Sequence, residues 1–201
     1  DGPPGQMVLV VPLGDDVRFY KVGLELFTAT GPQIVKQLVD HGKRVFLDLK
    51  LHDIPHTVES TVRVLAGYGA SMTTVHAGGG PAMLRAAVAA AAGTSLQLLA
   101  VTVLTSLSQE DLAADGHTQT LDSLVELRAM MAKAAGIHGV VCSPLEVATL
   151  KGFERGYEAL TGHVLFHALA PAPQPVALKR PLLMIPGLFM QPQSFDAVAN
   201  H

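Results

Sequence analysis

Three charged side chains, Asp48, Lys50 and Asp53, stand at short spacing at the end of an apolar stretch of this sequence. The stretch VFLDLKL is typical of a buried strand, and such a strand rarely accepts a charge that nothing pairs with or uses. Successive strand residues point to opposite faces, so Asp48 and Lys50 share one face. Asp53 follows in the next loop. Charged groups at the C-terminal end of a strand predict an active site in a protein built from β/α units.

Lys50 is the group with which this cluster could do chemistry. An ammonium flanked by two carboxylates can donate a proton and can stabilise negative charge that develops on a substrate. A purely structural ion pair between Asp48 and Lys50 is the alternative. We favour the catalytic interpretation, because desolvation offsets the attraction within buried ion pairs and makes them poor stabilisers.

The elements that must position these residues alternate between strand and helix patterns. Apolar, β-branched runs predict strands at residues 7–11, 19–24, 44–51, 71–76, 96–105, 139–142 and 182–188. Apolar residues at helical spacing predict helices at residues 31–42, 57–66, 81–92, 121–135 and 194–200. We expect Thr57 to cap the second helix, and Leu124, Val125, Met131 and Ala134 to face inward on the fourth. The alternation predicts an α/β protein, a (β/α)8 TIM-type barrel with residues 1–201 as a single domain.

Two features depart from a complete barrel. Residues 12–18 are too few for the first crossover helix, because parallel strands need a connection of about a dozen residues or more. The strand candidates number one fewer than the eight that a closed barrel of this type requires, so an eighth strand is not found. Residues 151–180 are rich in Pro and Ala and lack a clear period.

Composition indicates a soluble, cytoplasmic protein. Hydrophobic residues make up 49% of the chain, charged residues 15%, and the 14 Lys and Arg are scattered, which argues against nucleic-acid binding. Residues 86–109 carry no charge, but polar residues interrupt them, so we predict a helix end, a turn and a buried strand rather than a membrane span. The first residues, DGPPGQM, lack a signal-peptide pattern, and the single Cys142 cannot form an intrachain disulfide.

Five sequence blocks together suggest a family. FYKVGLELF, FLDLKLHDIPHTV, TVHAGGGPAML, LLAVTVLTSL and GVVCSPLE follow one another between about residue 15 and residue 150. In order and spacing they resemble the orotidine 5'-monophosphate decarboxylases, the last enzymes of UMP synthesis. The resemblance implies a (β/α)8 barrel that acts as a homodimer on a nucleotide, orotidylate, to give UMP, with no metal or organic cofactor.

The resemblance also implies roles for the charged residues. Lys50 would protonate C6 of the pyrimidine as carbon dioxide leaves, and Asp48 would lie beside the substrate carboxylate. Lys21 would bind the ribose and order the charges. Asp53 and Thr57 would be shared across the dimer interface.

Further substrate contacts follow from the same resemblance. Ile54 would lie near the site, and Thr105 or Ser106 would contact the pyrimidine. The segment MIPGLFMQPQ resembles a phosphate loop and supplies Pro186, Gly187 and Gln191, with Gln193 as an alternative to Gln191.

The remaining candidates have structural interpretations as well. His76 ends a strand and could reach the site, but a structural histidine is at least as good an interpretation. His52 is expected to pack locally, and Gly78 to Gly80 to form a turn before the helix at Pro81 rather than a phosphate loop.

The sequence departs from the family at both ends. Val10 or Val11 stands where the family has an aspartate, and no arginine matches the one that binds the 5'-phosphate; Arg180 precedes the strand. We therefore expect the functional enzyme to be longer than this chain. Two other functions stay open: a sugar-phosphate decarboxylase or aldolase that uses the same D-x-K-x-x-D pattern, and a non-catalytic nucleotide-binding barrel.

Overall fold

The computed structural model describes residues 18–143, 146, 150, 165–166 and 183–185. The predicted strand at residues 7–11 and the predicted helix at 194–200 lie outside them. Within the described residues the strands are β1 (Phe19–Gly23), β2 (Arg44–Leu51), β3 (Met72–His76), β4 (Gln97–Val101), β5 (Gly139–Cys142), β6 (Leu165–Phe166) and β7 (Leu183–Ile185). The helices are α2 (Leu24–Thr30), α3 (Gln33–Asp40), α4 (Pro55–Gly67), the 3-10 turn η2 (Ala77–Gly79), α5 (Gly80–Ala91), α6 (Gln109–Ala114) and α7 (Leu121–Ala135).

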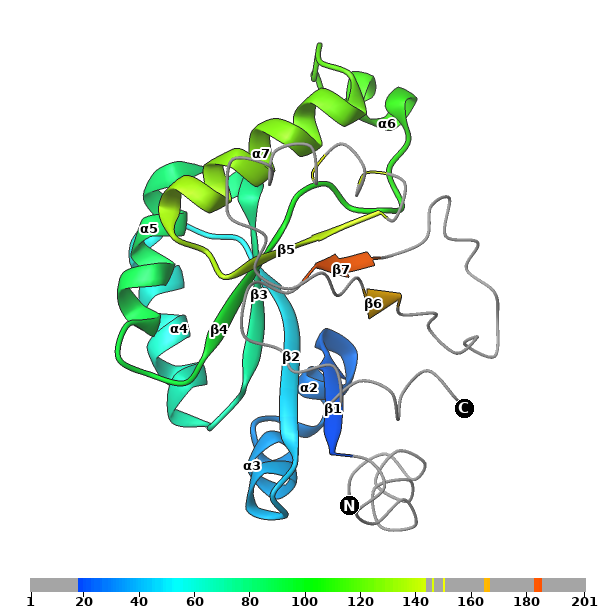
Figure 1. Cartoon of the computed structure of the whole chain (residues 1–201). Helices are drawn as coiled ribbons and strands as arrows, with labels where there is room; N and C mark the ends of the chain where they lie inside the picture. Colours follow the sequence, from blue (N-terminus) through cyan, green and yellow to red (C-terminus); the bar gives the residue numbers. More distant parts are fainter. Residues whose placement is uncertain (1–17, 144–145, 147–149, 151–164, 167–182, 186–201) are drawn as a thin grey trace, which may run out of the picture.

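The strands form one sheet in the order β1-β2-β3-β4-β5-β7-β6 (Figure 1). The first five run parallel, each joined to the next through helices, which confirms the prediction of an α/β fold built from β/α units. β7 runs antiparallel to β5, and β6 antiparallel to β7, unlike the all-parallel sheet expected. The apolar run at 182–188 predicted a strand there, but such a run carries no information about strand direction.

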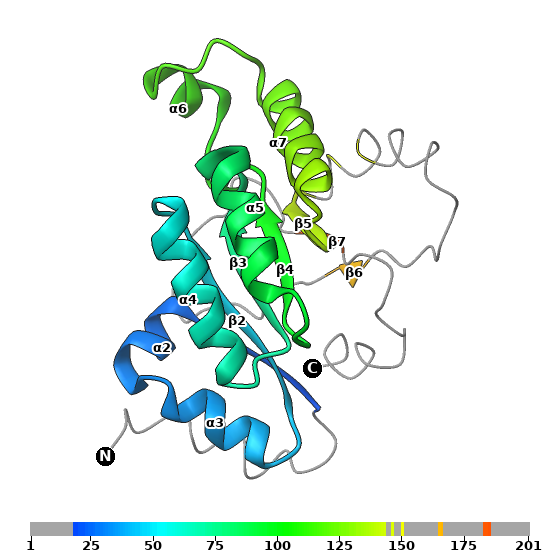
Figure 2. The same ribbon diagram turned by 90° about the vertical axis from the view of Figure 1, so that its left-hand side faces the viewer.

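The two faces of the sheet bury two different apolar layers. Helices α4, α5 and α7 lie side by side over one face (Figure 2). This outer layer contains alternate strand residues, among them Val45, Leu47 and Val75. The intervening residues form a smaller inner cluster of Phe19, Phe46, Met72, Leu99, Val101 and Val141. The period of two along each strand therefore separates a helix-covered face from an inner face.

Several local predictions are corrected. Ile54, not Thr57, is the N-cap of α4, because Pro55 suits the first helical turn and starts the helix earlier. β4 ends at Val101, four residues before the predicted end. On α7, Leu124 and Val125 are buried as expected and Met131 is partly buried, but Ala134 is exposed.

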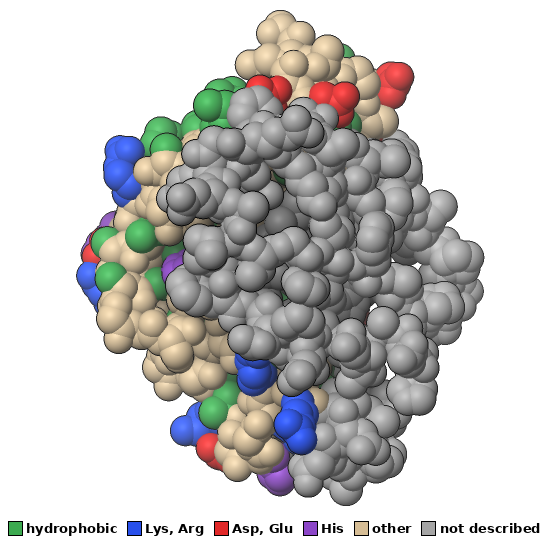
Figure 3. Space-filling model, viewed as in Figure 1, with side chains coloured by type: hydrophobic (Ala, Val, Ile, Leu, Met, Phe, Trp, Pro, Cys, Tyr) green, Lys and Arg blue, Asp and Glu red, His purple; other side chains and the backbone are tan. Residues whose placement is uncertain are grey.

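Two helices were not predicted. α2 follows β1 directly, and α6 is a short charged helix whose capping box, Ser108 with Asp111, was a usable sequence signal. α6 places acidic side chains at one end of the molecule, in red in Figure 3. Among the described residues, no helix combines the length and the apolar character needed to cross a membrane.

Candidate active site

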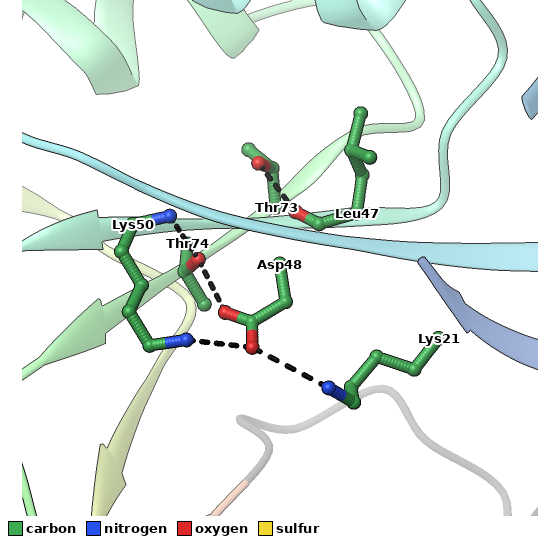
Figure 4. A network of polar contacts seen from close by, with 6 residues as sticks. All are labelled: Lys21, Leu47, Asp48, Lys50, Thr73 and Thr74. Atoms are coloured by element: carbon green, nitrogen blue, oxygen red, sulfur yellow. Dashed lines mark hydrogen bonds and ion pairs between the residues drawn. The ribbon is translucent and has the colours of Figure 1, made fainter. Parts of the chain in front are cut away.

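Part of the predicted charge cluster, Asp48 with Lys50, forms around one buried carboxylate, and Lys21 joins it. Lys50 Nζ lies 2.7 Å from Asp48 Oδ2, and Lys21 Nζ lies 3.7 Å from the same oxygen (Figure 4). The Asp48 side chain is 11% exposed, whereas the side chains of Lys50 and Lys21 are 39% and 37% exposed. Lys21 reaches this point because β1 lies beside β2, with Gly23 paired to Asp48. Two ammonium groups that share one carboxylate leave net positive charge, which suits an anionic ligand.

The backbone at Lys50 departs from a regular strand. Between the pairs Leu47 with Thr73 and Leu51 with Val75, β2 advances four residues while β3 advances two. Lys50 has φ of 52°, and it is the only non-glycine residue with positive φ among those that the structure describes. A bulky residue in this region is strained and is found mainly where function or surrounding contacts require it.

A buried threonine joins the irregular backbone to the carboxylate. The Lys50 amide donates to Thr74 Oγ1 at 2.8 Å, and that hydroxyl donates to Asp48 Oδ1 at 2.9 Å. The neighbouring Thr73 hydroxyl donates to the Leu47 carbonyl at 2.8 Å (Figure 4). Sequence reasoning did not single out Thr74.

Asp53, Ile54 and Thr57 all lie exposed near the start of α4. Asp53 Oδ1 accepts a hydrogen bond from the Ile54 amide at 2.7 Å. No ion pair joins Asp53 to Lys50 in the described part of the chain. Within one chain, then, the structure brings Asp48, Lys50 and Lys21 together and leaves Asp53 facing solvent.

The predicted pyrimidine and phosphate contacts divide into two groups. Thr105 is half-buried and Ser106 is exposed, both in the loop between β4 and α6. Pro186, Gly187, Gln191 and the alternative Gln193 lie outside the described residues.

His76 lies at the C-terminal end of β3, two residues beyond Thr74 on the same face. Its ring centroid is 5.1 Å from that of His52. Burial lowers the pKa of His76 to about 4; repulsion from His52, Lys50 and Arg128 acts in the same direction, and Asp48 opposes it. His76 is therefore a neutral imidazole at neutral pH, beside the charge cluster.

Arg128 on α7 is a second residue that sequence reasoning missed. Its Nη1 donates to the Thr102 carbonyl at 2.9 Å, in the segment that follows β4. Burial lowers the pKa of this guanidinium, while the charge of Asp115 opposes the shift. The guanidinium packs against Gly78, where an added Cβ would lie 3.2 Å from Arg128 Nη2. An arginine four residues after the buried Leu124 was the available signal.

The described residues contain no group of three or more His, Cys, Asp or Glu side chains arranged to hold a metal ion. The chemistry of the observed cluster is that of placed charges: one carboxylate, two ammonium groups and a neutral imidazole at the C-terminal edge of parallel strands. Such a site can bind an anion and can supply a proton to a carbon on which negative charge develops.

Comparison with known proteins identifies the family. The family model described as "Orotidine 5'-phosphate decarboxylase / HUMPS family" matches residues 6–165. The chain belongs to this family. TIM-type barrels characterise the family, and the parallel β/α units of β1 to β5 fit that fold.

Individual relatives agree with the family assignment. The chain is 47% identical over 144 residues to the orotidine 5'-phosphate decarboxylase of Bradyrhizobium sp. (strain ORS 278), which covers 72% of this chain and 58% of that protein. It is 51% identical over 138 residues to the enzyme of the same name from Streptococcus suis (strain 05ZYH33). That match covers 68% of this chain and 59% of the relative. The chain thus spans less than two thirds of the length of these relatives.

A solved structure also supports the family assignment. The crystal structure of orotidine 5'-phosphate decarboxylase from Lactobacillus acidophilus matches with a TM-score of 0.69 and 40% sequence identity. The match covers 74% of this chain and 70% of that one.

Proposed function

We propose that this chain carries the catalytic charge cluster of an orotidine 5'-monophosphate decarboxylase, a carbon-carbon lyase that forms UMP in pyrimidine biosynthesis. The observation that carries the proposal is the Asp48, Lys50 and Lys21 cluster in a chain of this family. Its net positive charge suits a substrate that carries a carboxylate and a phosphate.

In the proposed reaction the bond between C6 and the substrate carboxylate breaks, and its electron pair stays on C6. The Lys50 ammonium then transfers a proton to that carbon as carbon dioxide leaves. No adjacent carbonyl spreads the charge on C6, so placed cations must stabilise it. Lys50 can do so because the Asp48 carboxylate, 2.7 Å away, holds its ammonium at the inner face of the sheet.

Asp48 would face the substrate carboxylate, and their repulsion would be relieved as carbon dioxide leaves. Lys21 would bind the ribose from β1. Thr105 or Ser106 would contact the pyrimidine, and Pro186, Gly187 and Gln191 the phosphate end of the substrate. We also propose that the whole chain, residues 1–201, belongs to one barrel domain.

We further propose that the enzyme is a cytoplasmic homodimer, with Asp53 and Thr57 shared across the interface. The exposure of both residues, and of Ile54 at 65%, supports this arrangement. A partner that covers this surface would bury Ile54 and bring Asp53 toward a second site. Sedimentation of the wild-type chain and of an Ile54→Asp variant tests it: a wild-type monomer would contradict the shared site.

The activity is tested by following loss of orotidylate absorbance with wild-type protein and with two lysine variants, each with and without a chelator. We expect chelation to leave turnover unchanged, and Lys50→Ala to lower kcat by at least about a hundredfold, the usual contribution of a positioned acid. Lys36→Ala, at an exposed lysine on α3, is the control and should keep wild-type turnover.

The other outcomes separate the alternatives. Wild-type kcat in Lys50→Ala would show that another group donates the proton. Loss of activity on chelation would favour the metal-dependent sugar-phosphate enzymes. Binding of UMP without turnover would indicate a non-catalytic nucleotide-binding barrel.

A further inference from the structure

We propose that Thr74 is the positioning residue that fixes Lys50 relative to Asp48. The inference rests on the proposed function, in which this pair acts on the substrate. A single hydroxyl, 1% exposed, contacts both catalytic candidates: the main chain of one and the side chain of the other.

The first contact holds the strained backbone. Because β2 leaves its regular register with β3 between Leu47 and Leu51, the Lys50 amide has a side chain as its partner in place of a strand carbonyl. Thr74 Oγ1 accepts that hydrogen bond at 2.8 Å. Lys50 keeps its φ of 52° only if the surroundings stabilise it, and this bond is a direct constraint on that turn of the chain.

The second contact orients the carboxylate. An amide can only donate and a carboxylate only accept, so the single hydroxyl proton of Thr74 must point to Asp48 Oδ1. Oδ2 is then directed to Lys50 at 2.7 Å and to Lys21 at 3.7 Å. The Thr74 side chain thus sets both the rotation of the Asp48 carboxylate and the position of the Lys50 backbone (Figure 4).

The adjacent residue provides a matched control. Thr73 lies on the same strand, is also buried, and also donates its hydroxyl proton across to β2, to the Leu47 carbonyl at 2.8 Å. It contacts neither Asp48 nor Lys50 through any hydrogen bond of the described residues. Removal of either hydroxyl by Thr→Val keeps the side-chain shape and deletes one buried hydroxyl from the same pair of strands.

The experiment compares Thr74→Val, Thr74→Ser and Thr73→Val with wild type. We expect Thr74→Val to lower kcat for orotidylate by about tenfold to a hundredfold, the effect of a displacement of about 1 Å at a reacting group. KM should change little, because the substrate-binding groups are retained. Thr74→Ser keeps the hydroxyl and should stay within about threefold of wild type, as should Thr73→Val.

A second readout is independent of activity. Hydrogen exchange of the Lys50 amide, measured by NMR, should be faster by about tenfold or more in Thr74→Val and unchanged in Thr74→Ser and Thr73→Val, because an amide without its partner opens more easily. If the wild-type chain does not decarboxylate orotidylate, the proposed function fails. The exchange measurement still decides whether Thr74 fixes Lys50.

The proposal is overturned if Thr74→Val keeps wild-type kcat, or if Thr73→Val loses as much activity as Thr74→Val. Unchanged exchange of the Lys50 amide in Thr74→Val would overturn it as well. Should Thr74→Val fail to fold, Thr74→Cys replaces it. Its thiol is only a weak donor and a weak acceptor, so a loss of kcat relative to Thr74→Ser is again expected.

Discussion

Protonation of His76 should make the stability of this protein depend on pH. The pKa of His76 is about 4 in the folded chain, against an ordinary value of 6.5. Burial disfavours the protonated form of the ring, and so does repulsion from His52, Lys50 and Arg128, whereas Asp48 favours that form. Because the unfolded chain binds this proton more tightly, the free energy of unfolding should fall as pH falls from about 6.5 toward 4.

The magnitude follows from the two pKa values. Between about pH 7 and pH 5 the unfolded histidine becomes protonated while the folded one stays neutral, which lowers the free energy of unfolding by about 2 kcal/mol over this pH range. Solvent reaches part of the ring and screens the charges around it, so we expect about 1 kcal/mol. A His76→Gln variant removes this term, because glutamine does not titrate.

Urea unfolding at the two pH values, followed by circular dichroism, measures the effect for wild type and for His76→Gln. On acidification from about pH 7 to pH 5, the free energy of unfolding should fall by about 1 kcal/mol more in wild type than in His76→Gln. Met72→Leu, a substitution in the same strand that does not titrate, controls for a general loss of core stability and should lose as much as wild type. Equal losses in wild type and His76→Gln would refute the reasoning.

Two further predictions concern stability away from the site. In Gly79→Ala the new Cβ would overlap the sulfur of the buried Met83, so urea unfolding should show a loss of about 1–3 kcal/mol in the free energy of unfolding. Gly67→Ala should cost nothing, because its new Cβ would meet nothing within 4 Å beyond its chain neighbours and its own helix backbone. Equal stability of the two variants would contradict this. Ser108→Ala removes the capping box with Asp111, and should destabilise α6 by about 1 kcal/mol, seen as faster amide exchange in that helix. Unchanged exchange would show that the cap contributes little.

Elements with a strong hydrophobic pattern and clear ends could be predicted to the residue. β2 and β5 begin and end where the apolar runs do, and α7 fills the range between its start and the Gly136 cap. Boundaries that depend on local signals at a helix start, rather than on an apolar pattern, were missed. α4 starts before Thr57 because Pro55 fits the first turn, and α6 depends on a reciprocal cap rather than on an apolar face.

Strand alternation in the sequence determined that Asp48 and Lys50 share a face, and the ion pair between them confirms this. That prediction needs only the order of residues along one strand. It could not reveal Thr74, nor decide whether the candidate His76 lies beside the cluster, because both come from a neighbouring strand and separation along the chain does not fix distance in space. It also could not give the positive φ of Lys50, which arises where the pairing of β2 with β3 shifts. The residues for the chemistry are local in the sequence, and their orientation depends on contacts that only the folded sheet creates.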